Sequence, residues 1–283
     1  MINHFVPKSF SEALKILSEH NCYIFAGGTD LMVQKHTSTG LLPRFDKDVM
    51  YVMNLKELDY ISKDEKGNIH IGAATRYVEI ENSSLVPEIY KTVIREIASP
   101  NLRNMATMAG NIANASPAGD SLVPLVLNDA DVVLASVNGE RVISVDEFVL
   151  GVRKIDRHQD EMIKEIVIKP QKLDYFYRKV GSRKAESITK VSFLGGYKIE
   201  NNRLVDFRVA FGSVAIKTVR NREVEKKYLN KEIKELNVED VVRDYSNLVT
   251  PITDQRSNKE YRHKVAMNLL KKFLNDIKGG IDE

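Results

Sequence analysis

Apolar and polar residues alternate in short helical and strand patterns over the first 58 residues. Ser9 and Glu12 have the spacing of a capping box, and they open an amphipathic run that continues to Leu17, which predicts a helix. Residues 49–55 form an apolar run of strand length, which predicts a buried strand. We therefore expect a small subdomain that mixes helix and strand.

The mixed pattern continues over residues 59–172. The apolar runs here differ in length and are separated by turn residues, so strands and helices can be told apart. The expected elements are a strand over 68–71, a helix over about 86–98, a helix-like run over 122–127 and a strand over 132–137 that turns at Asn138-Gly139.

From about residue 173 the pattern changes to meandering strands followed by helices. Apolar runs at 193–199 and 204–211 are separated by Asn201-Asn202, which predicts a hairpin. Charged helical stretches follow. In the last of them Ser257 is the expected cap, and the expected buried face is formed by Tyr261, Val265, Leu269 and Phe273.

These patterns together predict an α+β protein of two domains. The N-terminal domain would cover residues 1–172, with subdomains of about 1–58 and 59–172. A smaller α+β domain, with an antiparallel sheet and helices, would cover 173–283.

The composition excludes several classes of protein. The chain has 283 residues, of which 43% are hydrophobic and 29% charged, which is typical of a globular protein with real cores. A net charge of +3 does not indicate nucleic-acid or membrane binding. No signal peptide or transmembrane stretch is recognisable, so we expect a cytoplasmic protein. Cys22 is the single cysteine, which excludes internal disulfides and a cysteine-ligated iron–sulfur cluster in this chain.

The most informative segment for function is rich in small residues and runs over 106–121. Small side chains let a ligand lie close to the backbone, where Thr107, Asn111, Asn114 and Ser116 could hydrogen-bond it. Asp120 is the only charged residue of the segment, and a carboxylate suits a sugar hydroxyl better than a phosphate. The alternative is a loop of small residues that only packs between two layers.

A second segment, residues 22–34, combines a short strand with a Gly27-Gly28-Thr29 turn. Consecutive glycines can direct successive backbone N–H groups at an anion, and Thr29 adds a hydroxyl. The segment matches neither the G-x-G-x-x-G fingerprint nor a phosphate loop of the G-x-x-x-x-G-K type. Together the two segments predict opposite walls of one dinucleotide cleft.

Catalytic motifs are scarce. The six histidines are scattered, with no H-E-x-x-H pair to hold a metal, and there is no G-x-S-x-G. Cys22 lies beside an expected core strand, where a buried inert thiol is the simpler interpretation. A dinucleotide cleft without an acid–base or metal cluster favours a protein whose chemistry belongs to its cofactor.

At the level of whole motifs the chain resembles the flavin-binding subunit of the molybdenum hydroxylases, the xanthine dehydrogenase and carbon monoxide dehydrogenase family. The matching segments are AGGTDL (26–31), LRNMATMAGNIAN (102–114), SPAGDS (116–121), YRKVGSRKA (177–185) and YRHKVA (261–266). They extend over nearly the whole chain in the family's order. The resemblance implies a two-subdomain FAD-binding (PCMH-type) domain followed by the family's C-terminal domain.

The resemblance also implies a set of FAD contacts. The pyrophosphate would be held by Ile24, Phe25, Ala26, Gly27, Gly28, Thr29, Asp30 and Leu31, and from the second segment by Thr107, Ala109, Gly110 and Asn111. Asp120 would hold the adenosine ribose. Ile97 and Ala98 would lie near the flavin ring, with Ile163 as an apolar contact and Lys179 as a donor. For Lys179 the alternative is a surface charge at the end of a strand.

One position departs from the family pattern. Ala109 stands before Gly110 where the family usually has two consecutive glycines. Alanine would be strained if this position required a positive φ, so we expect an ordinary backbone conformation here. Covalent attachment of FAD in related folds needs a suitably placed His or Cys. Neither binding segment contains His, and the cysteine is not in a binding turn, so we expect FAD to be bound non-covalently.

The function implied by the resemblance is that of an FAD-carrying electron-transfer subunit. Iron–sulfur and molybdopterin subunits would be its partners and would carry the [2Fe-2S] clusters and the molybdenum cofactor. Electrons would reach FAD from the clusters and pass to an acceptor, with NAD preferred over ferredoxin or oxygen. The alternatives are an independent flavin oxidoreductase with its own substrate and a scaffold subunit without flavin.

Overall fold

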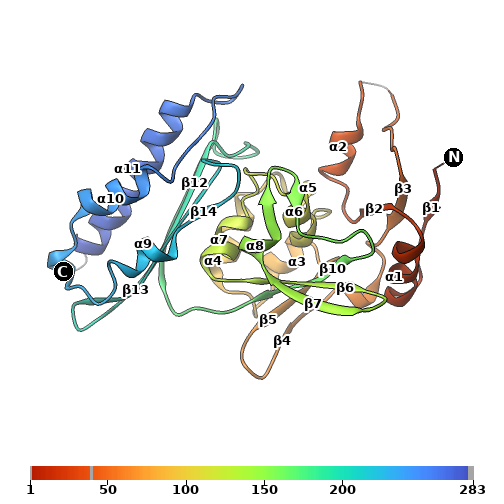
Figure 1. The fold of residues 1–283 in the computed structure, drawn as a ribbon, viewed down its shortest axis with the longest axis horizontal. Helices are drawn as coiled ribbons and strands as arrows, with labels where there is room; N and C mark the ends of the chain where they lie inside the picture. The colour runs from red at the N-terminus through yellow and green to blue at the C-terminus, as the bar shows by residue number, and fades with distance from the viewer. Residues whose placement is uncertain (1, 39–40, 280–283) are drawn as a thin grey trace. The chain divides into compact units, whose positions relative to one another are not determined.

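The computed structural model describes residues 2–38 and 41–279, which form two compact units. The first unit combines Met1–Ser116 with Asp129–Pro170, and the second unit combines Pro117–Asn128 with Gln171–Glu283. The sequence pattern places residues 117–128 in the N-terminal domain, whereas their contacts group them with the C-terminal part of the chain. Figure 1 shows the elements of both units.

The first unit begins with a small parallel sheet of strand order β1-β3-β2. Its elements are β1 (His4–Phe5), α1 (Phe10–Glu19), β2 (Cys22–Phe25), α2 (Leu31–Lys35), β3 (Asp48–Tyr51) and the 3₁₀ turn η1 (Lys56–Leu58). The helix predicted from Ser9 is present as α1. As expected for its cap, the Ser9 side chain accepts a hydrogen bond from the Glu12 amide. The strand predicted over 49–55 ends at Tyr51, since Leu55 N–H turns back to the Val52 carbonyl.

A second sheet of the first unit is antiparallel throughout, in the order β4-β5-β10-β6-β7. Its strands are β4 (Ile61–Lys63), β5 (Ile69–Gly72), β6 (Asp131–Ser136), β7 (Gly139–Ser144) and β10 (Met162–Ile168). The hairpin predicted at Asn138-Gly139 joins β6 to β7. The other elements of this unit are α3 (Tyr77–Asn82), α4 (Glu88–Arg95), α5 (Pro100–Arg103), α6 (Met108–Asn114), α8 (Val145–Phe148), β8 (Val149–Gly151) and β9 (Lys154–Ile155).

The sequence pattern suggested that the small-residue segment 106–121 is a loop. The structure shows instead that a helix forms part of it. Thr107 caps α6, which continues to Asn114 and ends where Ala115 adopts a left-handed conformation. Small residues are compatible with a helix when its turns must pack closely, and Met108, Ala109 and Ile112 of α6 are buried.

The second unit is an antiparallel meander in the order β11-β12-β13-β14. Its elements are α7 (Leu122–Leu127), β11 (Asp174–Val180), β12 (Val191–Glu200), β13 (Arg203–Gly212), β14 (Val219–Arg220), α9 (Arg222–Lys226), the turn η2 (Ile233–Glu235), α10 (Val238–Ser246) and α11 (Lys259–Gly279). Gly195 faces Phe273 of α11, and the next residue, Gly196, faces Leu127 of α7. Successive residues of a strand point to opposite faces, so α11 and α7 cover opposite faces of this sheet.

The last helix differs from its prediction in cap and in register. Asn258 is the cap, because its side chain accepts a hydrogen bond from the Tyr261 amide at 2.8 Å and its carbonyl accepts one from the Arg262 amide. Tyr261 is 44% exposed, and the buried face is made of Arg262, Ala266, Met267, Leu270, Phe273, Leu274 and Ile277. Within the described residues no helix has the length and apolar character needed to cross a membrane.

Candidate functional site

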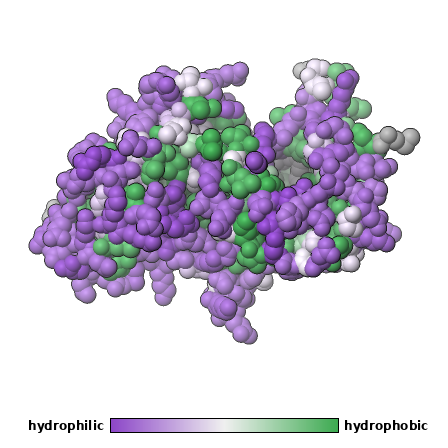
Figure 2. Space-filling view, in the orientation of Figure 1, coloured by the Kyte–Doolittle hydropathy of each residue, from purple (hydrophilic) through white to green (hydrophobic). Residues whose placement is uncertain are grey.

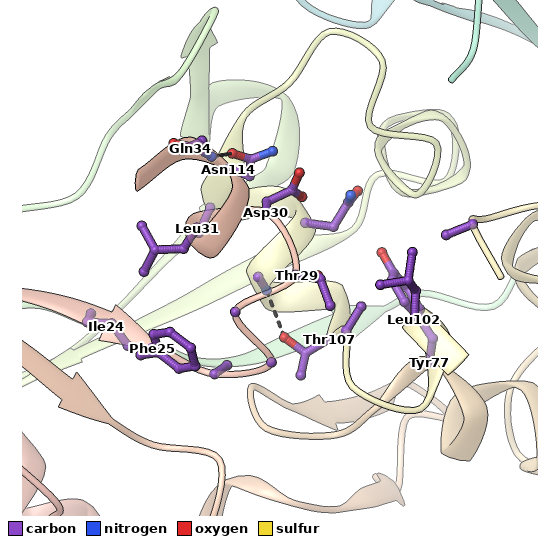
Figure 3. A pocket seen from close by; sticks show the side chains of 18 of the residues that line it. Ile24, Phe25, Thr29, Asp30, Leu31, Gln34, Tyr77, Leu102, Thr107 and Asn114 are labelled. Carbon is purple, nitrogen blue, oxygen red and sulfur yellow. Dashed lines mark hydrogen bonds between the residues drawn. The ribbon is translucent and has the colours of Figure 1, made fainter. Parts of the chain in front are cut away.

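The first unit contains a pocket of about 400 Å³ between the turn after β2 and one face of α6. Figure 3 shows how the labelled side chains from both segments converge on it. The lining residues are Tyr23, Ile24, Phe25, Ala26, Gly27, Gly28, Thr29, Asp30, Leu31, Gln34, Tyr77, Ile97, Ala98, Leu102, Ala106, Thr107, Gly110, Asn111, Ala113, Asn114 and Arg153. The two segments predicted as walls of one cleft therefore line the same pocket.

The glycines of the turn after β2 are required by its geometry. A Cβ on Gly27 would overlap the backbone carbonyl of Met105, so only glycine lets this turn approach that segment so closely. Gly28 has a φ of +68°, and a Cβ there would overlap the Phe25 ring. These contacts fix the path of the backbone along the wall of the pocket.

The amide groups of this turn are available to a ligand. Within residues 2–38 and 41–279, the backbone N–H groups from Gly27 to Asp30 donate no hydrogen bond to a protein acceptor. The Thr29 hydroxyl likewise has no protein partner among the described residues. Consecutive free amides beside a pocket are suited to bind an anionic oxygen, such as that of a pyrophosphate.

The opposite wall is one face of α6. Thr107 is 3% exposed, and its Oγ1 accepts a hydrogen bond from the Gly110 amide at 3.0 Å. Thr107, Gly110, Asn111 and Asn114 follow one another at helical spacing and all line the pocket. The hydroxyl proton of Thr107 is left to donate to a ligand.

Ala109 has an ordinary helical conformation inside α6, as expected, because it is not among the residues with positive φ. It is 5% exposed and does not line the pocket. The backbone conformation at position 109 therefore does not require the glycine that the family usually has there.

Asn114 connects the two walls. Its Oδ1 accepts hydrogen bonds from Gln34 Nε2 of α2 at 2.7 Å and from Arg153 Nη1 at 2.8 Å. Figure 3 shows the Gln34 contact above the pocket. Arg153 also donates its backbone N–H to the Ala115 carbonyl at 2.9 Å, which places a cationic side chain at the pocket.

Most of the residues that the resemblance assigned to FAD lie in this pocket. Those found there are Ile24, Phe25, Ala26, Gly27, Gly28, Thr29, Asp30, Leu31, Ile97, Ala98, Thr107, Gly110 and Asn111. Ile163 is 6% exposed within β10 and does not line the pocket. Asp120 and Lys179 belong to the second unit.

Sequence reasoning missed several lining residues. Ala113 had a signal, the helical spacing after Thr107, which could have added it to the site, whereas Asn114 was expected to bind a ligand and does line the pocket. Tyr77 and Arg153 come from distant parts of the chain and carry no local motif. Tyr77 is placed at the pocket because its backbone N–H bonds the Ala106 carbonyl at 2.9 Å.

Asp120 and Lys179 form a buried ion pair in the second unit. Lys179 Nζ lies 2.8 Å from Asp120 Oδ2, and the two side chains are 7% and 8% exposed. The Thr189 hydroxyl donates to Asp120 Oδ1 at 2.5 Å. Burial raises the pKa of Asp120, against the opposing effects of the Lys179 charge and the Thr189 hydrogen bond. Lys179 is therefore not a surface charge at the end of a strand.

The described residues offer little other catalytic chemistry. Among them no group of three or more His, Cys, Asp or Glu side chains is arranged to hold a metal ion. Cys22 is buried, and burial raises the pKa of its thiol, which disfavours the reactive thiolate.

Comparison with known protein families identifies what this arrangement belongs to. The model for the FAD binding domain in molybdopterin dehydrogenase matches residues 1–171, and the model for the CO dehydrogenase flavoprotein C-terminal domain matches residues 176–277. The chain belongs to the FAD subunits of the molybdenum hydroxylase family. It is thus an oxidoreductase subunit with FAD as its cofactor, as the resemblance in sequence had implied.

The similarity of this FAD subunit to known relatives extends over nearly its whole length. It is 30% identical to the glyceraldehyde dehydrogenase medium chain of Sulfolobus acidocaldarius, with 95% of this chain and 96% of the relative covered. It is 26% identical to the xanthine dehydrogenase FAD-binding subunit of Escherichia coli O157:H7, with 95% and 93% covered.

Solved structures agree on the fold. The structure of a Cu,Mo-CO dehydrogenase in its cyanide-inactivated form matches with a TM-score of 0.87, 21% identity and 98% of both chains covered. The carbon monoxide dehydrogenase of Hydrogenophaga pseudoflava that lacks the Mo-pyranopterin moiety also matches with a TM-score of 0.87, at 22% identity, over 97% of this chain and 96% of that one.

The residues of the pocket fit the FAD of this family. The free amides from Gly27 to Asp30 match an anionic pyrophosphate, and Arg153 adds a positive charge. Gly27 and Gly28 carry no side chain, so a ligand can approach the backbone of the turn closely. FAD would supply the redox chemistry there.

Proposed function

We propose that this subunit binds one FAD non-covalently in the pocket of the first unit. We further propose that it passes electrons from the iron–sulfur clusters of a partner subunit to NAD⁺. The observation that carries the FAD proposal is the row of amides from Gly27 to Asp30, which have no acceptor among the described residues and face a helix capped by Thr107. A buried or half-buried N–H group without an acceptor is costly, and a bound pyrophosphate would remove that cost.

Individual residues have separate parts in this proposal. Amides of the Gly27–Asp30 turn and the hydroxyls of Thr29 and Thr107 would bind the pyrophosphate, with Gly110 keeping the start of α6 open. Ile97 and Ala98 would border the flavin ring. From the resemblance, Ile163 and Lys179 would also lie near the ring, and Asp120 would accept hydrogen bonds from the adenosine ribose.

The proposed partners follow from the relatives. Several of these are medium chains or FAD subunits of dehydrogenases, such as the carbon monoxide dehydrogenase medium chain of Hydrogenophaga pseudoflava. The partner chains here would be an iron–sulfur subunit and a molybdopterin subunit, and the substrate would be oxidised at molybdenum. A cytoplasmic location stays a prediction from the sequence.

The cofactor proposal is tested by purifying the chain and identifying what it releases on denaturation. We expect the two visible absorption bands of a flavin and release of FAD. Release of FMN, or no flavin after reconstitution with excess FAD, would contradict the proposal. The acceptor is tested in the reconstituted complex by comparing NAD⁺, ferredoxin and oxygen as oxidants, with NADH formation expected.

A further inference from the structure

Ser213 occupies a strained and buried position between β13 and β14 of the second unit. It is 6% exposed and has a φ of +65°, in the left-handed region that favours glycine. A non-glycine residue persists there only where the surroundings hold it in place. The contacts of Ser213 show what holds it.

Each polar atom of Ser213 has a partner in the same unit. Its N–H donates to the Pro117 carbonyl at 2.9 Å, and its Oγ donates to the Thr189 carbonyl at 2.9 Å. Its carbonyl lies 3.5 Å from Nη1 of Arg262, a buried side chain that also pairs with Asp254 at 2.6 Å. Ser213 thus joins the segment before α7, the strand region before β12 and the start of α11.

Two of the residues that Ser213 contacts, Pro117 and Thr189, are themselves close to Asp120, one in sequence and one through a hydrogen bond. Pro117 begins the turn that ends at Asp120, and the residue whose carbonyl Ser213 holds, Thr189, donates its own hydroxyl to Asp120 Oδ1 at 2.5 Å. The preceding Gly212 lets this region pack closely, because a Cβ there would overlap the Ser192 side chain and lie 2.8 Å from a methyl carbon of Val123.

We propose that Ser213 and Thr189 are positioning residues that fix the carboxylate of Asp120 for its ligand. This inference rests on the proposed function, in which that ligand is the ribose of FAD. Thr189 occupies one lone pair of Oδ1 and Lys179 one of Oδ2, and a carboxylate has about four such positions. Both oxygens can therefore accept a further hydrogen bond from neighbouring ribose hydroxyls.

The hydroxyl contacts give serine a role at a backbone position that suits glycine. Glycine would relieve the strain but would lose the hydroxyl that holds Thr189. Alanine would lose the hydroxyl and keep the strain. Lys179 restrains only Oδ2 of Asp120, so without Thr189 the carboxylate could rotate about its Cβ–Cγ bond.

The test is a set of FAD titrations on the full chain after removal of its flavin, with thermal unfolding measured on the same samples. Thr189→Val removes the hydroxyl at nearly constant shape, and Thr189→Ser keeps it. Thr189→Val, Ser213→Ala and Ser213→Gly should each raise the FAD dissociation constant about threefold to tenfold, the range expected for one lost hydrogen bond. Thr189→Ser should restore affinity to within about twofold of the unmodified chain.

Asn202→Gly is the matched control, since Asn202 also has a positive φ, at the opposite end of the same sheet. It should change the unfolding temperature and leave the FAD affinity unchanged. In the Asp120→Ala background, Ser213→Gly should have no further effect on affinity, because the group that it positions is gone.

The outcomes separate this inference from the proposed function. If Asp120→Ala weakens FAD binding and the Thr189 and Ser213 variants do not, Asp120 is a ligand residue and the positioning role is wrong. If Asp120→Ala leaves affinity unchanged, the ribose assignment fails and the inference fails with it. Ser213→Gly keeps the test valid should Ser213→Ala not fold, because glycine is unstrained at this φ.

Discussion

At the scale of single residues, the most sensitive position of the pocket is Gly28. Its φ of +68° and the overlap of an added Cβ with the Phe25 ring both oppose any side chain there. Gly28→Ala should abolish measurable FAD binding and cost at least about 1–2 kcal/mol of stability from the backbone conformation alone. FAD titration and urea unfolding measure the two effects.

Gly67 is a suitable control, because it has a φ of +88° in the same unit and, among the described residues, the nearest neighbour of an added Cβ would be Lys63 at 3.8 Å. Gly67→Ala should lower stability by a similar backbone cost and leave FAD affinity unchanged. Equal loss of FAD affinity in both variants would mean that strain in general, and not the path of the Gly28 turn, controls binding.

His70 is expected to make stability depend on pH. Its Nδ1 lies 3.1 Å from Glu165 Oε1 and its Nε2 lies 3.4 Å from Asp64 Oδ2, so only the protonated ring can donate to both carboxylates. Burial alone would lower the pKa of His70, but the hydrogen bonds and charges of Glu165 and Asp64 outweigh it and raise the pKa above its ordinary value of 6.5.

A raised pKa in the folded state means that His70 stabilises the fold fully below pH 6.5 and that this stabilisation is lost as the pH rises through the folded-state pKa. Urea unfolding of the unmodified chain and of His70→Gln should differ most below pH 6.5 and converge at higher pH. His36→Gln, at an exposed histidine, should show no such trend. A difference between His70→Gln and the unmodified chain that does not vary with pH would refute this assignment.

At the scale of secondary-structure elements, a prediction concerns which of two residues, Asn258 or Ser257, caps the start of α11. Asn258 accepts the Tyr261 amide at 2.8 Å, whereas the Ser257 hydroxyl only reaches the Asn258 carbonyl at 3.5 Å. Asn258→Ala should lower the free energy of unfolding by about 1 kcal/mol, and Ser257→Ala by much less. Thermal and urea unfolding of the two variants provide the comparison, and the reverse order would support the sequence-based cap.

Much of the element order could be predicted from the sequence, because it depends on local signals. The β12–β13 hairpin followed from Asn201-Asn202, which both have positive φ in the structure, and α7 has the bounds of its apolar run. The face of α11 was predicted only in part. Phe273 is buried and Val265 and Leu269 are partly buried against the same core, but Tyr261 is exposed and the fully buried stripe includes the charged Arg262. A buried arginine is recognised only when its partner Asp254 is seen.

Within the pocket, the same distinction between local and distant signals applies. The Gly27-Gly28-Thr29 turn and the residues after Thr107 were recognised because motif and composition are local. Tyr77 and Arg153 reach the pocket through long-range backbone bonds, to Ala106 and Ala115, that no sequence pattern encodes. The pairing of Asp120 with Lys179 is likewise a product of the tertiary structure, since 59 positions separate the two residues.

At the scale of the whole molecule, the proposed function predicts that the subunit is incompetent alone. We expect the isolated FAD-loaded chain to reduce a dye slowly with NADH but not to hydroxylate purines or other N-heterocycles. Addition of the iron–sulfur and molybdopterin subunits should bring about substrate-dependent flavin reduction. Rapid-mixing spectroscopy measures this reduction directly. Stoichiometric oxidation of a small substrate by the isolated chain would instead favour an independent flavin oxidoreductase.

The path of the chain between its two units has a consequence for how the protein can be divided. The second unit includes Pro117–Asn128, which the chain supplies before it returns to finish the first unit. A protease that cuts once near residue 170 would therefore leave α7 on the N-terminal fragment while its packing partners β12 and β13 lie on the other. Such a nicked protein should stay together as a non-covalent pair. A gene fragment that encodes only residues 171–283 would yield a sheet with one apolar face uncovered, so this C-terminal region is not a transferable module.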